Sequence, residues 1–194
     1  MSPQSMVHSP EQTLEEKLTH VKNLLSDLGR VVVAFSGGVD STLLAKLARD
    51  VFGKEHALAV TADSPSLARE DLDVACRVAS QLDLLHLVIA TREVERPAYQ
   101  RNTPMRCYVC KRELFVELED VARARGLSVV LYGAIGDDQL AERPGQQAAH
   151  DFGVRAPLQE AGLEKWEVRQ LAKSLGLPNW DRPQTPASPP ASRT

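Results

Sequence analysis

A glycine-rich segment between a strand and a helix constrains the fold of this chain more than any other feature. The five apolar residues 31–35 (VVVAF) have the length and continuity of a strand covered on both faces. The next six residues, 36–41, read Ser-Gly-Gly-Val-Asp-Ser, and a helical pattern runs over residues 42–52. Strand, glycine loop and helix together predict a parallel α/β unit whose loop can bind an anion.

The residue types of this loop suit a phosphate group. Its two glycines allow the backbone to turn tightly and to approach a ligand closely. The helix that follows directs unpaired N–H groups and the positive end of its dipole toward the same place, and two serines add hydroxyl donors. The carboxylate of Asp40 cannot bind phosphate directly, but it could hold a Mg²⁺ ion that bridges phosphate oxygens, or cap the helix. The predicted phosphate-binding set is Ser36, Gly37, Gly38, Val39, Asp40 and Ser41.

Two more common nucleotide-binding loops are excluded by the residues present. A Walker A loop places Gly-Lys before Ser or Thr at the start of a helix, whereas Gly53-Lys54 is followed by Glu55 at the far end of one. The dinucleotide-binding fingerprint requires three glycines at fixed offsets, and the pair Gly37-Gly38 lacks the third. A turn that merely joins strand to helix remains the alternative interpretation.

The rest of the chain alternates between strand and helix patterns. Short apolar runs predict strands over residues 57–61, 84–90 and 128–132, and helical spacing predicts helices over 67–82, 111–125 and 163–175. An amphipathic pattern over 14–28 predicts a first helix that starts near Ser9-Pro10, and the polar stretch 91–105 predicts irregular structure. The whole predicts an α/β fold with an open parallel sheet flanked by helices.

Composition limits the class of protein. With 194 residues, 43% hydrophobic and 25% charged, the chain fits one folded domain of ordinary globular composition. Lys and Arg number 23 against 26 Asp and Glu, so the net charge of −3 offers no field for nucleic acid. The sequence shows no apolar run of membrane-spanning length and no export signal, which predicts a cytoplasmic protein with no membrane partner. This composition is also compatible with a homo-oligomer.

Three cysteines in a chain without an export signal argue against a disulfide scaffold. Cys76 falls on the apolar face of the predicted helix 67–82, which predicts a core position. Cys107 and Cys110 precede the predicted helix 111–125 among basic residues, a setting that favours thiolate. They could ligate an iron–sulfur cluster or another metal, carry sulfur, or be two semi-buried thiols.

Further motifs give a resemblance to a known family. The six-residue loop resembles the PP-loop signature of the ATP pyrophosphatase superfamily, whose members cleave ATP between its α and β phosphates. This loop and five further motifs lie between Arg30 and Pro183. Together they make the chain similar to the LarE-type ATP-dependent sacrificial sulfur transferases. The supporting motifs, in family order and spacing, are RCYVCK (106–111), YGAIGDD (132–138), Arg143-Pro144-Gly145, Ala156-Pro157-Leu158 and GLEKWEVRQLAKSLGLPNWDRP (162–183).

The resemblance implies a fold, a reaction and cofactors. The fold is a Rossmann-like PP-loop domain over residues 30–177, preceded by a tail and helix over 1–29 and followed by a Pro-rich tail over 178–194. The reaction is Mg²⁺-dependent adenylylation by ATP of a carboxylate on a small pyridinium mononucleotide, with pyrophosphate release. Sulfur transfer follows, in biosynthesis of the nickel-pincer nucleotide cofactor of lactate racemase.

Several residues outside the loop are candidates for this site. The resemblance implies that the adenine ring lies near Thr61 and Ala62, at the end of the second predicted strand. Gly133 would clear space for the nucleotide and Asp137 could contact Mg²⁺, although a turn rich in Gly and Asp explains the same residues. The remaining candidates are the basic residues Arg106 and Arg143, which are either clamps for an acceptor phosphate or solvated surface charges.

The chain departs from the family where sulfur is donated. The family's donor cysteine follows Trp-Asp-Lys-Pro, whereas here Pro183 is followed by Gln184-Thr185-Pro186, and no cysteine follows Cys110. The chain also ends where the family continues into a smaller C-terminal region. Adenylylation is therefore expected, and Cys107 and Cys110 stay as candidates for the sulfur step. The alternatives are an impaired nucleotide-binding remnant or another PP-loop ligase, either an amide-forming synthetase or a tRNA-thiolating enzyme.

Overall fold

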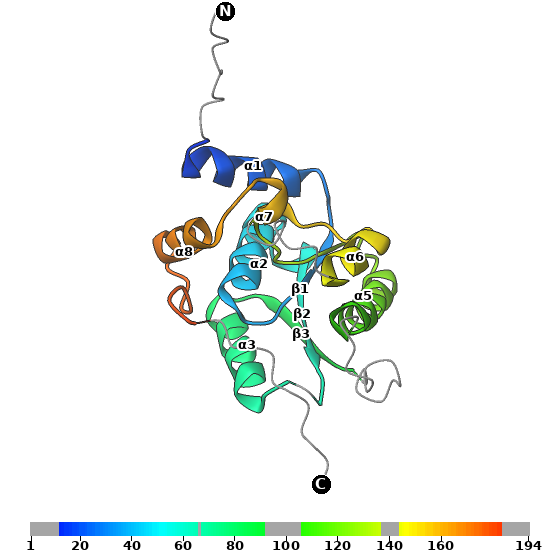
Figure 1. Ribbon diagram of the computed structural model, residues 1–194. Helices are drawn as coiled ribbons and strands as arrows, with labels where there is room; N and C mark the ends of the chain where they lie inside the picture. Colours follow the sequence, from blue (N-terminus) through cyan, green and yellow to red (C-terminus); the bar gives the residue numbers. More distant parts are fainter. Residues whose placement is uncertain (1–11, 66, 92–105, 137–143, 184–194) are drawn as a thin grey trace, which may run out of the picture.

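The computed structural model describes residues 12–65, 67–91, 106–136 and 144–183. A four-stranded parallel sheet stands in the middle with helices on both faces (Figure 1). This arrangement confirms the predicted α/β class. The strands are β1 (Val31–Ala34), β2 (Ala57–Asp63), β3 (Leu85–Ala90) and β4 (Val129–Leu131).

The order of the strands creates a crevice beside β1. The sheet runs β3-β2-β1-β4, and every neighbouring pair is parallel. The chain leaves β1 on one side to form β2 and β3, and later returns to form β4 on the other side. Connections from β1 and β4 therefore diverge to opposite faces, which opens a crevice at the carboxyl ends of these two strands.

Helices cover the two faces of the sheet unequally. Helices α5 (Arg106–Arg125) and α6 (Pro144–Asp151) cover one face (Figure 1). A 3₁₀ turn η1 (Lys54–His56) leads into β2. The other described helices lie on the opposite side of the sheet. These helices are α1 (Leu14–Ser26), α2 (Val39–Phe52), α3 (Arg69–Gln81), α7 (Pro157–Glu160) and α8 (Lys165–Ser174).

Burial on both faces explains the continuous apolar run of β1. Val31 and Val33 are buried in the core beneath α1, α2 and α8. Val32 is buried in the second core, against Phe115 and Leu118 of α5. Alternating side chains of one strand therefore enter two different cores, so none of these three positions tolerates a polar residue.

Several boundaries differ from the sequence predictions. Helix α1 begins at Leu14 because Thr13 and Glu16 form a capping box, whereas Ser9-Pro10 lies outside the described residues. Helix α5 begins at Arg106 rather than at 111, so both CxxC cysteines lie within the helix and not before it. Helices α6 and α7 were not predicted, since both are short and follow loop-like sequence.

The prediction that Cys76 lies in the core was wrong. Cys76 is exposed, while its neighbours Ala75, Val78 and Ala79 are buried. Each residue advances about 100° around a helix, so position 76 lies at the rim of the face that contains 75, 78 and 79.

The C-terminal part of the described chain has no regular structure, as expected, but it is packed. Residues 178–183 form turns without a helix or strand. Asn179 is nevertheless 5% exposed. The stretches 92–105 and 184–194, also expected to be irregular, lie outside the described residues. None of the helices in the described ranges has the length and apolar content that crossing a membrane requires.

A partly buried ion pair attaches the first helix to the last. Lys17 Nζ lies 2.8 Å from Glu167 Oε2, and the Glu167 side chain is only 5% exposed. Lys17→Met removes the cation from this buried carboxylate, which keeps its bond from the Glu164 N–H. We expect a loss of about 2–3 kcal/mol in the free energy of unfolding, the scale of a lost hydrogen bond to a charged group. Urea denaturation measures it.

Lys46→Met is the matched control, because Lys46 pairs with Asp50 one turn away on the more exposed surface of α2. That pair should contribute less than about 0.5 kcal/mol. Equal losses in the two variants would contradict the structural importance of the pair formed by Lys17.

Candidate functional site

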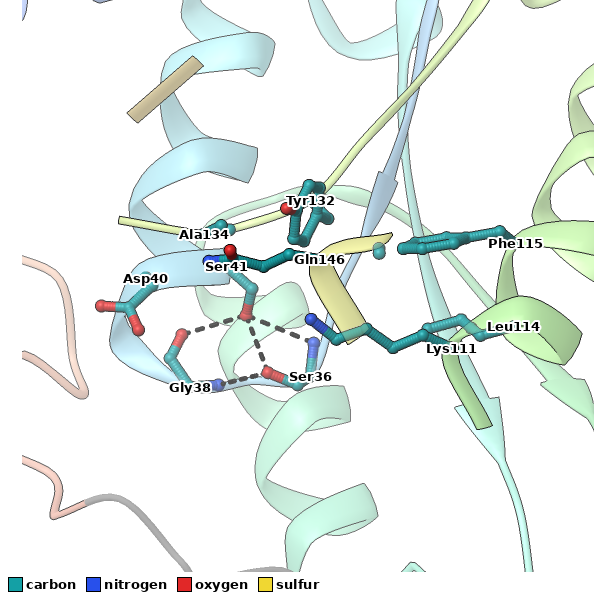
Figure 2. A pocket seen from close by; sticks show the side chains of 12 residues that line it. Ser36, Gly38, Asp40, Ser41, Lys111, Leu114, Phe115, Tyr132, Ala134 and Gln146 are labelled. Atoms are coloured by element: carbon teal, nitrogen blue, oxygen red, sulfur yellow. Dashed lines mark hydrogen bonds between the residues drawn. The ribbon is translucent and has the colours of Figure 1, made fainter. Parts of the chain in front are cut away.

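A pocket of about 270 Å³ lies at the crevice between the ends of β1 and β4. Its walls come from the loop after β1, the segment that follows β4, and helices α5 and α6 (Figure 2). Ligands of open parallel sheets bind at this type of position, where the strand order reverses. The pocket is lined by Ala34, Ser36, Gly38, Asp40, Ser41, Lys111, Leu114, Phe115, Tyr132, Gly133, Ala134 and Gln146.

The loop is held in an open turn by its own hydroxyl groups (Figure 2). Ser41 Oγ donates to the carbonyl of Gly38 at 3.1 Å and accepts from the N–H of Ser36 at 3.2 Å. Ser36 Oγ accepts from the N–H of Gly38 at 3.3 Å and lies 3.1 Å from Ser41 Oγ. The bond from Gly38 is long, so an anion in the pocket can replace it at little cost.

Two glycines are required by close backbone approaches. A Cβ on Gly37, whose φ is +72°, would lie 2.7 Å from Cα of Ala75 in α3. A Cβ on Gly133 would lie 2.9 Å from the backbone nitrogen of Ser41, in the first turn of α2. Real Cβ atoms do not approach backbone so closely, so these glycines allow α3 and the segment after β4 to pack against the loop.

Asp40 is paired with a lysine that sequence analysis did not identify. Lys165 Nζ, at the start of α8, donates to both carboxylate oxygens of Asp40 at 2.8 Å. The side chains of Lys165 and Asp40 are 22% and 18% exposed, so the pair is shielded from solvent, and Asp40 lines the pocket. The Asp40 carboxylate offers oxygen ligands of the kind Mg²⁺ prefers, and the group fits this site.

A second lysine reaches the loop from the opposite side. Lys111 of α5 points toward the loop, and its Nζ lies 5.1 Å from the ring centroid of Tyr132 (Figure 2). Nothing in the local sequence shows that α5 faces the loop, so Lys111 was not predicted as a site residue. The two lysines place positive charge on both sides of a loop rich in N–H donors, a combination suited to a polyphosphate.

The structure brings together only part of the predicted site. Of the predicted loop residues, Ser36, Gly38, Asp40 and Ser41 line the pocket, together with Gly133. Gly37 and Val39 also belong to the loop, but they are buried and do not line the pocket.

The predicted adenine residues do not line the pocket. Thr61 is buried, and its hydroxyl donates to the carbonyl of Phe35 at 2.7 Å, which ties β2 to the end of β1. Thr61 Oγ1 also lies 2.8 Å from Nε2 of His86. Since the Thr61 proton is used, Nε2 of His86 is the donor. Burial lowers the pKa of His86, so the ring is neutral near pH 7.

The cysteine segment is only partly described. Arg106 and Cys107 lie in the first turn of α5, with side chains outside the described part, and Cys110 is half-buried. Asp137 and Arg143 lie outside the described residues. Within the ranges that the structure describes, no three His, Cys, Asp or Glu side chains gather as metal ligands would.

The start of α5 is tied to α6 beside the pocket. Tyr108 donates its hydroxyl to Asp151 at 2.8 Å, and Gln147 donates to the other carboxylate oxygen at 2.7 Å. The bond from Gln147, followed by that from Tyr108, lowers the pKa of Asp151. These contacts hold the two helices that form one wall of the pocket.

The fold and the loop define a class of protein. A parallel sheet with a lysine-free Ser-Gly-Gly-Val-Asp-Ser loop between β1 and α2, opposite the end of β4, is a PP-loop domain. The NAD synthase family model matches residues 11–135, and the chain belongs to this family. The solved NMN synthetase of Francisella tularensis has the same fold, with a TM-score of 0.70 at 21% identity over 90% of this chain and 76% of that one.

Two relatives are more similar in sequence. The chain is 46% identical to an uncharacterised protein of Synechocystis, over 89% of this chain and 64% of the relative. It is 39% identical to the pyridinium-3,5-bisthiocarboxylic acid mononucleotide synthase of Lactiplantibacillus plantarum, over 88% of this chain and 62% of that enzyme. The chain thus spans less than two thirds of the length of either relative.

The contact between Gly133 and α2 can be tested by substitution. Gly133→Ala inserts a methyl group against the Ser41 backbone, so we expect the first turn of α2 to shift and stability to fall by about 1–3 kcal/mol. Amide hydrogen exchange over residues 36–42 should accelerate.

Gly126→Ala is the matched control, because Gly126 has a φ of +64° but open space around its missing side chain. It should cost stability without changing exchange in the loop. Equal exchange over 36–42 in wild type and Gly133→Ala would show that the two segments are not packed as described.

Proposed function

We propose that this chain binds Mg²⁺–ATP in the crevice and uses it to adenylylate a carboxylate on a small nucleotide. The observation that carries the proposal is the pocket itself, in which loop donors, Lys111 and Asp40 surround one space at the switch point of the sheet, with Lys165 paired to Asp40. Family membership and the similarity to a mononucleotide synthase support the same reaction class.

The chemical step balances as a substitution at the α phosphorus of ATP. A carboxylate oxygen of the acceptor forms the new bond to phosphorus, and the bond from that phosphorus to the oxygen bridging to the β phosphate breaks. Pyrophosphate leaves with the electron pair, and an acyl adenylate remains. No general base is needed, because the attacking carboxylate is already ionised.

The residues of this chain would stabilise the departing pyrophosphate. The N–H of Gly38 and the N–H groups of the first turn of α2 supply donors that need no reorganisation. Lys111 adds charge from α5. Lys165, which contacts Asp40, would exchange that contact for a phosphate oxygen. Mg²⁺, when bound, neutralises charge on the phosphate oxygens, and Asp40 is the described residue that would hold it.

The acceptor and adenine sites extend the same proposal. By analogy with the Lactiplantibacillus enzyme, the acceptor is a carboxylated pyridinium mononucleotide, whose phosphate Arg106 and Arg143 would bind. Thr61 and Ala62 stay the predicted neighbours of adenine, and Asp137 stays a predicted contact for Mg²⁺. The division into residues 1–29, 30–177 and 178–194 also stays a prediction.

Sulfur transfer is the second half of the proposed reaction. The similar enzyme is named for a thiocarboxylic acid product. A cysteine thiolate would attack the carboxyl carbon of the acyl adenylate, and AMP would leave with the carboxyl oxygen. Breakage of the cysteine Cβ–S bond, with loss of its Cα proton, would then release the thiocarboxylate and leave dehydroalanine in the protein. In this sequence Cys107 and Cys110 are the candidates to hold that sulfur, directly or through an iron–sulfur cluster.

A second candidate function is nucleotide binding or adenylylation without sulfur transfer. Residues 184–194, which follow Trp180-Asp181-Arg182-Pro183, contain no cysteine, and this local departure from the family's donor segment favours it. The intact masses of protein and acceptor after incubation with Mg²⁺–ATP and a carboxylated pyridinium mononucleotide distinguish the two. A thiolated acceptor supports sulfur transfer, whereas an adenylylated acceptor alone supports the second candidate.

Replacing Asp40 tests the adenylylation step. Asp40→Ala removes the carboxylate at the pocket and leaves Lys165 without this partner. Pyrophosphate release with the carboxylated acceptor should fall about 100-fold or more, the scale expected when transition-state charge loses its support.

Asp50→Ala is the control, since Asp50 lies on the same helix, pairs with Lys46 and does not line the pocket. It should release pyrophosphate at the wild-type rate. An Asp40→Ala protein that retains full release would contradict the role proposed for this carboxylate.

A further inference from the structure

A buried asparagine holds the phosphate-binding loop from behind. Asn179 belongs to the turn 178–183 that follows α8, and it is 5% exposed. Its Nδ2 donates to the carbonyl oxygen of Gly37 at 2.8 Å and to Oγ1 of Thr42 at 2.9 Å. The contact with Gly37 joins residues 142 positions apart in the chain, so only the tertiary fold creates it.

The bond to Gly37 fixes the direction of the N–H of Gly38. The two groups belong to one peptide unit, and the described chain has no cis peptide bond. In a planar trans peptide the carbonyl and the N–H point in opposite directions. Since the Gly37 carbonyl faces Asn179, the Gly38 N–H faces the other way, to the side where it contacts Ser36 Oγ and lines the pocket.

Hydrogen bonds within the loop hold the peptide between Gly37 and Gly38 only weakly. Gly37 has a φ of +72°, and glycine peptides rotate more freely than any others. The bond from Gly38 to Ser36 is long at 3.3 Å. Oδ1 of Asn179 is buried and has no hydrogen-bond partner among the described residues, which costs stability. The amide therefore stabilises the loop only through the two hydrogen bonds that Nδ2 donates.

We propose that Asn179 is a positioning residue for phosphate recognition, because it directs the Gly38 N–H toward the pocket. The inference rests on the proposed function, in which the loop binds the phosphates of ATP. It places part of the C-terminal turn, beyond the predicted domain boundary at 177, in the structural support of the nucleotide site.

Asn179→Asp tests the proposal with almost no change in volume. It replaces the donor with a carboxylate oxygen that repels the Gly37 carbonyl, which should turn the peptide away from its native direction. Calorimetric titration with inorganic pyrophosphate and Mg²⁺ should show binding weakened about tenfold or more, as for loss of one hydrogen bond to a charged group. Titration with adenosine, which carries no phosphate, should give an unchanged dissociation constant.

Thr42→Val is the matched control, since it removes the other partner of Asn179 and leaves the Gly37 bond. It should lower the melting temperature and bind pyrophosphate as wild type does. Asn179→Ala provides a second variant without a buried charge, in case Asn179→Asp fails to fold, and should weaken pyrophosphate binding in the same direction.

Three results would overturn the inference. The first is a folded Asn179 variant that binds pyrophosphate as tightly as wild type does. The second is an equal loss of adenosine and pyrophosphate binding, and the third is a pyrophosphate affinity equal to that of the Thr42→Val protein. Wild-type protein that binds neither probe would contradict the proposed function itself, which separates that failure from a failure of the role of Asn179.

Discussion

The site depends on the close approach of the segment after β4 to the first turn of α2. Only a residue without a side chain fits at Gly133, where a Cβ would lie 2.9 Å from the backbone of Ser41. This contact brings the loop after β1 and the chain after β4 to one space, at the point where the strand order reverses. Lysines, hydroxyls and backbone donors then converge on that space because strand and helix positions are already fixed.

The loop itself carries little charge, and the side chains that hold and surround it come from distant parts of the chain. Lys165 reaches Asp40 from α8, Lys111 reaches the loop from α5, and Asn179 holds Gly37 from the C-terminal turn. Such a loop depends on its surroundings to keep its donors in place while the pocket is empty. Preorganised donors of this kind contribute most to catalysis, since they do not have to rearrange as charge develops.

The features that depend on neighbouring residues in the chain were predicted from the sequence. The apolar run 31–35, the glycines at 37 and 38 and the helix after them identify the loop, and the strand and helix alternation identifies the sheet. The partners Lys165 and Asn179 could not be predicted, because they lie 125 and 142 residues from Asp40 and Gly37. The burial of Thr61 depends on how β2 packs, and the exposure of Cys76 on how far the buried face of α3 extends around the helix, which the apolar pattern alone does not define.

The most direct measurement is a crystal structure of the protein with Mg²⁺ and α,β-methylene-ATP, an analogue that resists cleavage between the α and β phosphates. The β and γ phosphates should accept hydrogen bonds from the N–H of Gly38 and from the first turn of α2, with Lys111 at the same phosphates. A triphosphate bound elsewhere, with the bond from Gly38 to Ser36 intact and the loop empty, would contradict nucleotide binding by this loop.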